Sequence, residues 1–571
     1  MGDSGPGPGP RRERRAPPRA PTVASGDGGG GGDGGAGTLR VSSPVGRWVL
    51  LTTVLGSSMA LLDSTVVNVA LPHIGLDLNA DLAVLQWTVN AYMLTLAGLI
   101  LLGGALGDRF GRRRVFVIGV VWFSVASLLC GLAPNAGMLI ASRALQGIGG
   151  ALLTPGSLAL IQATFHPDDR ARAVGLWSGF GGVGAAIGPF VGGWLVDGPG
   201  WRWVFFLNVP LAAVCVPVAL RHVPESRDPR GHGRFDVLGA ALGAPALGAV
   251  TYALIAAPGK GASPAVIVPA VLGVLLGVAF VHVERRRAAD AMLPLDIFAS
   301  RQFTAVNAVT LCVYAAFSGF FFLAVLQLQV VVGYSALAAG TALLPTTVLM
   351  LLLSARSGEL GRRIGPRIPL TVGPLLCAAG MLLMTRAGVG AVYWRDVLPA
   401  LLVLGLGMVA LVAPLTATVL ASVEVERAGL ASGINNAAAR AAGLIAVAAL
   451  PLLAGMGPEA YRSADRFAET FGRAMPICAG VLVLGALVAW RTVRPDALEQ
   501  APTEPAAAPA AAPAVEEGAA AEAAGVEVAG EGAEEKAVRR RPCRPECAYH
   551  CGVGAPPLDP GDLGTPGGRG T

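Results

Sequence analysis

The sequence has little charge, few aromatic residues and almost no lysine. Only 14% of its 571 residues are charged and 6% are aromatic, and Lys occurs only at positions 260 and 536. Soluble domains carry about 25% charged residues, so this composition excludes a chain that mostly faces water. The first 46 residues are rich in Gly, Pro and Arg and lack the apolar core of a cleavable signal peptide. We therefore expect the first apolar helix to direct insertion into the membrane.

What the sequence has instead is glycine and long apolar runs. Hydrophobic residues make up 53% of the chain, Gly occurs 78 times, and the mean hydropathy is +0.60. A membrane-spanning helix needs about 20 apolar residues. Runs of this kind occur at about 48–70, 84–105, 115–132, 138–162, 172–196, 202–221, 237–257, 264–283, 303–331, 337–355, 369–387, 395–420, 432–456 and 474–490. The sequence thus predicts an all-α polytopic membrane protein with fourteen transmembrane helices.

Arginine is distributed unevenly between the loops on the two sides of the predicted helices. Arg-rich loops follow the second, tenth and eighth runs, whereas the loops at 71–83, 133–137 and 332–336 contain no Arg or Lys. Cytoplasmic loops carry the excess of basic residues. We therefore expect the chain to lie in the cytoplasmic membrane, with both termini on the cytoplasmic side.

The eight cysteines indicate neither a disulfide framework nor a metal centre. Five of them are scattered one to an apolar run, as small core residues are. Cys543, Cys547, His550 and Cys551 cluster near the end of the chain, but their spacing matches no standard zinc finger. We predict no metal, no organic cofactor and no nucleic-acid partner.

An internal repeat divides the chain. GALGDRFGRR at 104–113 matches GELGRRIGPR at 358–367 in six of ten positions, and the same offset of 254 maps Gly175, Leu176, Ser178 and Gly179 onto identical residues. The repeat predicts two six-helix bundles in parallel orientation, at 47–222 and 301–492, with two inserted helices within 223–300. Tails at 1–46 and 493–571 are expected to be disordered and cytoplasmic. Transporters built from such halves bind substrate between them.

Two ionisable residues lie inside apolar runs of the first half. Asp63 belongs to LDSTVVNVALP at 62–72, and Arg143 to RALQGIGGA at 143–151, with Gln146 one turn further along the same helical face. Charges at this depth are expensive and are expected to face a cavity or a partner. A proton-coupling or substrate-binding role is one interpretation, and a structural hydrogen bond or ion pair is the other.

Gating and packing residues are predicted in two further motifs. In the loop after the second run, Asp108 could accept hydrogen bonds from a helix N-terminus across the interface between the halves. We expect it to act with Arg109, Gly111 and Arg112, although arginine there also serves simple positive-inside anchoring. In the fifth run, Gly184, Gly188 and Gly192 recur every four residues and permit close helix contact, while Pro189 bends the helix.

These motifs together resemble the major facilitator superfamily, specifically its fourteen-helix drug:proton antiporters, over about residues 47–492. The resemblance implies the major facilitator fold and a proton-transfer role for Arg143. It also implies an antiporter motif in the fifth helix, whose close packing prevents protons from leaking through the protein. In the second half Arg362 stands in the place of Asp108, and Val397 in that of Arg143. The coupling machinery is therefore expected in the first half alone.

The predicted function is proton-coupled efflux of small, hydrophobic or cationic drugs or antibiotics by alternating access. The expected partners are the substrate, protons and the lipid bilayer, with the chain acting as a monomer. An uptake facilitator, an exporter of one dedicated metabolite and a membrane sensor are the alternatives; a membrane enzyme would need a nucleophile or a nucleotide loop, and we find neither. Polar residues expected to line the cavity, or else to join helices, are Asn68, Tyr92, Asn307, Gln327, Asn435 and Arg440.

Overall fold

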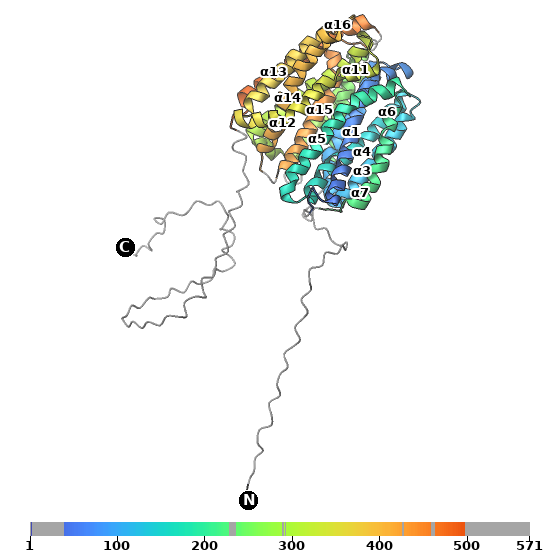
Figure 1. Ribbon diagram of the computed structural model, residues 1–571. Coiled ribbons are helices and arrows are strands. Elements are labelled where there is room, and N and C mark those ends of the chain that lie inside the picture. The colour runs from blue at the N-terminus through green and yellow to red at the C-terminus, as the bar shows by residue number, and fades with distance from the viewer. Residues whose placement is uncertain are drawn as a thin grey trace, which may run out of the picture. The chain divides into compact units, whose positions relative to one another are not determined.

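The chain forms a membrane-type helical body (Figure 1). The computed structural model describes Gly2 and residues 39–227, 236–287, 291, 293–424, 427–457 and 463–496. The first bundle contains α1 (Pro44–Asp77), α2 (Leu82–Phe110), α3 (Arg112–Gly131), α4 (Ala136–Thr164), α5 (Pro167–Asp197), α6 (Trp203–Phe206) and α7 (Asn208–His222). Two inserted helices follow, α8 (Val237–Lys260) and α9 (Pro264–Arg287). The second bundle contains α10 (Arg301–Leu326), α11 (Ala336–Ala342), α12 (Leu344–Ile364), α13 (Arg367–Leu383), α14 (Leu398–Ala421), α15 (Ala428–Leu453) and α16 (Ala464–Thr492).

The helices fall on the predicted apolar runs. Among the described residues, thirteen helical segments are long and apolar enough to cross a membrane. The remaining predicted run, 172–196, lies within α5, which is 31 residues long. Two runs are each built from two helices, because α6 continues into α7 and α11 into α12 after a single intervening residue. The predicted all-α fold is confirmed.

Short polar residues start many of these helices. Asp81 accepts a hydrogen bond from the backbone nitrogen of Val84 at 2.9 Å, and Asn135 accepts one from Met138 at 2.9 Å. Ser43 and Ser335 cap α1 and α11 in the same way. Each cap satisfies a backbone donor that has no partner within its own helix. An unpaired backbone donor is most costly where a helix end approaches hydrocarbon, because no water is available there to bind it.

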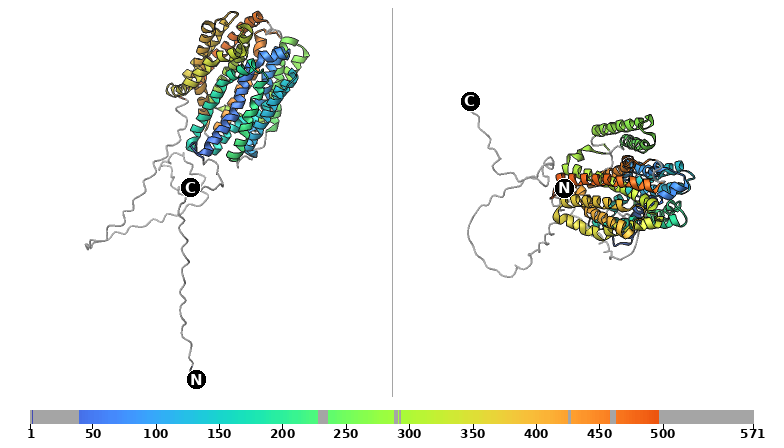
Figure 2. Two further views of the ribbon diagram at one scale, coloured as in Figure 1. Left: turned by 45° about the vertical axis from the view of Figure 1, so that its right-hand side comes forward. Right: turned by 90° about the horizontal axis from the view of Figure 1, so that it is seen from above.

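The two inserted helices stand beside the bundles rather than inside them. Figure 2 shows the green α8–α9 pair on one flank of the molecule. The two helices pack against each other, and α8 also contacts α2 of the first bundle and α15 of the second. In α9, exposed apolar side chains such as Val268 and Leu275 are more than half accessible. This helix therefore presents its surface to lipid.

The repeat is visible in the backbone at equivalent positions. Gly111 follows α2 with φ 112° and Gly365 follows α12 with φ 76°, both in the region that favours glycine. These positions are separated by the offset of 254 found in the sequence. We name the end of the body that carries these two turns the arginine-rich end, and the other the opposite end.

The described part of the chain begins within the segment expected to be the first tail. Leu39 pairs with the connection between α4 and α5, where its nitrogen donates to Thr164 at 3.2 Å and its carbonyl accepts from His166 at 2.9 Å. Most of the two predicted tails, including the cluster of Cys543, Cys547, His550 and Cys551, lies outside the described residues.

Candidate functional site

A fully buried ion pair lies inside the first bundle. Asp63 on α1 and Arg143 on α4 are 2% and 1% exposed, and Arg143 Nη1 lies 2.5 Å from Asp63 Oδ2. Breaking such a pair by removing one partner costs about 3–5 kcal/mol, because a buried charge is left uncompensated. The two ionisable residues singled out in the sequence are therefore direct partners.

Two amide groups complete the hydrogen bonding of the Asp63 carboxylate, and both also donate to the Ser127 hydroxyl. Gln146 Nε2 donates to Asp63 Oδ1 at 2.7 Å and to Ser127 Oγ at 3.1 Å. Asn208 on α7 donates to Ser127 Oγ at 2.8 Å and reaches Asp63 Oδ1 at 3.5 Å. The sequence identified Gln146, but it gave no signal that Ser127 of α3 joins the network, since a lone Ser in an apolar run is common.

Arg143 is held from both sides. Its Nε donates to the carbonyl of Thr88 at 3.0 Å, and its guanidinium carbon lies 4.4 Å from the ring centre of Tyr92 on α2. The ring of Phe205 lies 5.8 Å away on another side. Six helices of the first bundle, α1 to α4, α6 and α7, thus converge around one charge pair. We name Asp63, Arg143, Gln146, Ser127 and Asn208 the buried polar cluster.

The glycine motif of α5 packs directly onto the helix that carries Asp63. A methyl group built at Gly188 would come within 2.0 Å of Thr65 Oγ1, and one at Gly192 within 3.0 Å of Val66. Gly184 faces Ser58 in the same way at 3.1 Å. Only glycine allows this approach, so the predicted close packing of the fifth helix is present and its partner is α1.

In the predicted gating loop, the side chain of Asp108 bonds within the first bundle. Asp108 is partly exposed and accepts a hydrogen bond from Arg112 Nε at 2.8 Å, one turn away within the same bundle. The guanidinium of Arg109 lies 5.9 Å from the ring centre of Phe110. The expected contact of Asp108 with a helix N-terminus of the second bundle stays a prediction.

Glu225, in the connection after α7, packs against this loop, and the sequence did not reveal its role. Its carboxylate accepts from the backbone nitrogens of Arg113 at 3.0 Å and Arg114 at 3.2 Å, and so caps α3. A methyl group at Gly111 would lie 2.7 Å from Glu225 Oε1. Gly111 is thus required both for its positive φ and for the space that Glu225 occupies.

At the opposite end an acid does join the two bundles. Asp197, the last residue of α5, accepts from the backbone nitrogens of Ala336 at 3.1 Å and Leu337 at 2.9 Å, at the start of α11. A carboxylate is favourable at a helix N-terminus because it meets unpaired amides and the positive end of the dipole. The sequence predicted this kind of contact for Asp108 and gave no indication of it for Asp197.

Two glutamines reinforce the same end. Gln86 Nε2 on α2 donates to the carbonyl of Val447 on α15 at 2.7 Å, and Gln329 Nε2 donates to that of Val69 on α1 at 2.9 Å. A methyl group at Gly340 of α11 would lie 2.1 Å from the carbonyl oxygen of Pro189. The bundles are therefore closely packed at the opposite end.

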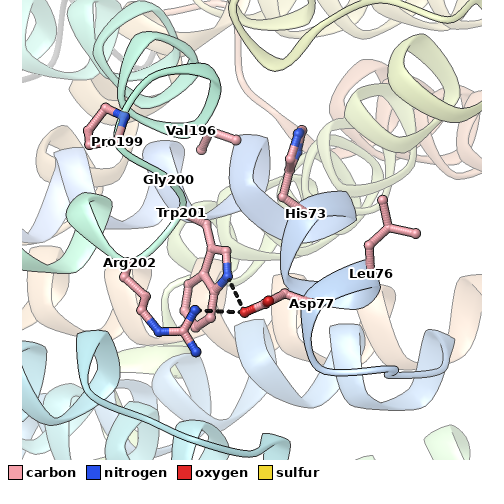
Figure 3. Close-up of a pocket in the computed structure, with 8 residues that line it drawn as sticks. All are labelled: His73, Leu76, Asp77, Val196, Pro199, Gly200, Trp201 and Arg202. Atoms are coloured by element: carbon pink, nitrogen blue, oxygen red, sulfur yellow. Dashed lines mark hydrogen bonds and ion pairs between the residues drawn. The ribbon is translucent and has the colours of Figure 1, made fainter.

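A surface pocket lies beside this sealed end (Figure 3). Asp77, the last residue of α1, accepts hydrogen bonds from Trp201 Nε1 at 3.0 Å and Arg202 Nη1 at 2.6 Å. The Arg202 guanidinium also stacks over the Trp201 ring at 4.4 Å. The close-up shows His73 on the same helix as Asp77, one turn before it. These contacts fix the end of α1 to the connection before α6.

The predicted cavity residues divide into three groups. Asn307 and Asn435 bond to each other at 3.1 Å across α10 and α15, and Gln327 donates to the carbonyl of Ala387 at 2.6 Å. These three residues join helices of the second bundle. Tyr92 is buried under Arg143, while Asn68 Oδ1 and Arg440 Nε are buried with no hydrogen-bond partner among the described residues.

Comparison with known proteins agrees with this architecture. The family model described as Major Facilitator Superfamily matches residues 53–447. The crystal structure of a D-xylose-proton symporter has a TM-score of 0.56 and 17% sequence identity, over 79% of this chain and 98% of that chain. At this identity the likeness concerns the fold alone.

Curated relatives are more similar in sequence. The puromycin resistance protein pur8 of Streptomyces alboniger is 36% identical, over 80% of this chain and 94% of its own. The tetracenomycin C resistance and export protein of Streptomyces glaucescens is 35% identical, over 71% of this chain and 75% of its own. With a family model matched over more than half its length, the chain belongs to the major facilitator superfamily as a multi-pass membrane transporter related to antibiotic resistance exporters.

Proposed function

We propose that this transporter exports small drug-like or antibiotic molecules across the cytoplasmic membrane in exchange for protons. The observation that carries the proposal is the Asp63–Arg143 pair, which is fully buried in the first bundle. Intramembrane ionisable residues mark substrate or ion pathways by default. The kinship with puromycin and tetracenomycin C resistance proteins supports drug efflux as the use of such a pathway.

The proton step acts on the carboxylate of the buried polar cluster. Binding of a proton to Asp63 cancels its charge and leaves Arg143 with only its bonds to Gln146 and to the carbonyl of Thr88. An arrangement of α1 and α4 in which Arg143 has another partner then has the lower free energy. Loss of the proton restores the pair. Protonation of this one residue thereby shifts the equilibrium between two arrangements of the bundle, as a coupled transporter requires.

The two ends of the body supply the corresponding conformational change. In this structure Asp197 and the two glutamines join the bundles at the opposite end, while Asp108 accepts a hydrogen bond from Arg112 of its own bundle. The N-cap residue of α15, Arg427, makes no side-chain cap hydrogen bond. We propose that Asp108 caps α15 when the Asp197 contact opens, so that access alternates between the two sides.

The arrangement in the cell follows from the same proposal. The arginine-rich end faces the cytoplasm, where Arg-rich loops are retained, and both termini lie on that side. Substrate enters from the cytoplasm or the inner leaflet and leaves at the opposite end. The chain works as a monomer, with the proton as its only coupling partner.

Proton release in reconstituted vesicles tests the proposal. The purified full chain is placed in proteoliposomes with a pH-sensitive dye, and puromycin is added as the probe. We expect drug-dependent proton movement with the wild type and none with Asp63→Asn. Export of the probe that ignores an imposed pH gradient would refute proton coupling.

The direction of transport is tested separately, because the fold also serves uptake. In inverted membrane vesicles with the inside acidified, an exporter accumulates the probe. Accumulation in right-side-out vesicles instead would identify the chain as an uptake facilitator.

A further inference from the structure

Arg440 is a cation in the middle of a membrane-spanning helix. It is the thirteenth of the 26 residues of α15. At 1.5 Å per residue it lies roughly 18 Å from the start of the helix. An arginine near a helix end can extend to the lipid headgroups, but from this depth the guanidinium cannot reach them. Its charge must therefore be accommodated inside the protein.

The structure provides no counter-charge for it. Within the part of the chain that the structure describes, no hydrogen bond or ion pair engages the Arg440 guanidinium, and its Nε is buried without a partner. The contrast with Arg143 is direct, since that guanidinium binds Asp63, Gln146 and a backbone carbonyl. Arg440 is half-buried in the middle of the helix, where a charge without a partner is costly unless a ligand supplies one.

Hydrogen-bonding groups line a pocket beside Arg440. The pocket lies between α10, α14 and α15 and includes Ala439, the residue before Arg440. The described residues of this pocket are Tyr314, Thr416, Val419, Leu420, Ser432, Asn435, Asn436 and Ala439. None of these lining residues is acidic, so the unpaired charge near this pocket is positive.

We propose that Arg440 binds an anionic group, a carboxylate or a phenolate, on the transported molecule. The inference rests on the proposed export function and specifies the chemistry of its substrate. Guanidinium binds carboxylates through two parallel N–H···O bonds, and the hydroxyl of Tyr314, which lines the pocket, can donate to an acidic group there. The apolar part of the molecule would occupy the pocket lined by Val419 and Leu420.

This assignment differs from the hydrophobic or cationic substrates predicted from the sequence. A cation would suit Asp63 if that acid were free within the membrane. Asp63 is fully engaged by Arg143, Gln146 and Asn208, so it offers no charge to a substrate in this structure. Arg440 is the residue whose charge is left for the ligand.

Binding of a matched acid and ester tests the proposal. The purified full chain in detergent is titrated with anthracene-9-carboxylate and with its methyl ester, and binding is followed by fluorescence anisotropy at neutral pH. We expect the wild type to bind the acid at least about tenfold more tightly than the ester, a difference of about 1.4 kcal/mol. Arg440→Gln should bind both equally, and Arg440→Lys should keep part of the preference.

Arg286→Gln is the matched control, because it removes one exposed arginine from the end of α9, away from the pocket. It should bind both probes as the wild type does. A wild-type protein without a preference for the acid, including one that binds neither probe, overturns the proposal. Retention of the preference by a folded Arg440→Gln protein overturns it as well. Should Arg440→Gln not fold, the ratio of the affinities for acid and ester, measured for the wild type and for Arg440→Lys, still tests the proposal.

Failure of this inference and failure of the export function give different results. An Arg440-dependent preference for the acid, with no proton movement in vesicles on addition of either puromycin or anthracene-9-carboxylate, contradicts proton-coupled export and supports the anion site. Proton-coupled export of puromycin without any preference for the acid contradicts the anion site and leaves the export function intact.

Discussion

Asp197 Oδ2 lies 2.9 Å from the backbone nitrogen of Leu337, and this contact joins the end of α5 to the start of α11. The two helices belong to different bundles that must separate at this end if substrate is to leave there. The contact is made by an exposed carboxylate and backbone amides, which exchange readily for water. It is therefore suited to hold one end closed without making the closure permanent.

Replacing Asp197 by Ala should open the opposite end more often. Loss of hydrogen bonds from backbone amides to a charged acceptor at an exposed position costs about 1 kcal/mol, which is roughly a fivefold change in population. The test places a cysteine at Ser318 of α10, which packs against Gly443 of α15 where Met93 of the first bundle also approaches, in a protein without other reactive cysteines. Labelling of intact cells by a membrane-impermeant maleimide should be about fivefold faster.

Asp168→Ala is the control for this experiment. Asp168 is an exposed acid on the first turn of the same helix, at the arginine-rich end, where it pairs with Arg40. Its removal should leave the labelling rate of the Ser318→Cys protein unchanged. Equal rates for the Asp197 and Asp168 variants would show that Asp197 does not hold the end closed.

Asp63→Asn should lower stability as well as abolish proton coupling. The substitution leaves Arg143 charged, buried and without its carboxylate, at a cost of about 3–5 kcal/mol. The double variant Asp63→Asn/Arg143→Gln removes both charges and should regain most of the lost melting temperature while staying inactive in the proton assay. Restored coupling in the double variant would mean that the pair is structural and that protons act elsewhere.

Gly188→Ala should disturb the contact of α5 with α1. The new methyl group would lie 2.0 Å from Thr65 Oγ1, and overpacking of this kind costs about 1–3 kcal/mol. We expect a lower melting temperature, and partial recovery when Thr65→Ala is added. Gly175→Ala on the same helix has open space around it and should behave as the wild type. An unchanged Gly188→Ala protein would argue against close packing as the role of the motif.

The two positive-φ turns should respond alike to substitution. Gly111→Ala forces an L-residue to φ 112° and places its methyl group 2.7 Å from Glu225, while Gly365→Ala does so at φ 76° and 2.2 Å from the Pro495 carbonyl. Each strained position costs about 1–3 kcal/mol. Gly107→Ala, inside α2 and with no neighbour closer than 4.0 Å, should not destabilise. Thermal unfolding in detergent compares the three variants.

Most of the fold could be predicted from the long apolar runs. They have the length of the bilayer and little charge, so their identity as helices needed no tertiary information. The offset of 254 predicted equivalent turns, and Gly111 and Gly365 occupy them with positive φ. Caps such as Asp81 and Asn135 explain helix starts that hydropathy placed only to within a few residues.

The site was predictable where a residue is rare in its surroundings. Asp63, Arg143 and Arg440 stand out because charge inside apolar sequence is expensive. Ser127, Glu225 and Asp197 were missed because their roles depend on which helix ends meet in three dimensions. An acid at the end of a helix is ordinary in sequence, and only the packing of α5 against α11 shows that Asp197 joins the bundles.

The inserted pair α8–α9 makes the body asymmetric towards lipid. Because α8 packs against both α2 and α15, it covers the seam between the bundles on that flank. On the other flank the seam is formed by α5 against α11 and α12. A molecule dissolved in the bilayer would therefore meet an inserted helix on the first flank and the bundles themselves on the second, which favours lateral entry on the second.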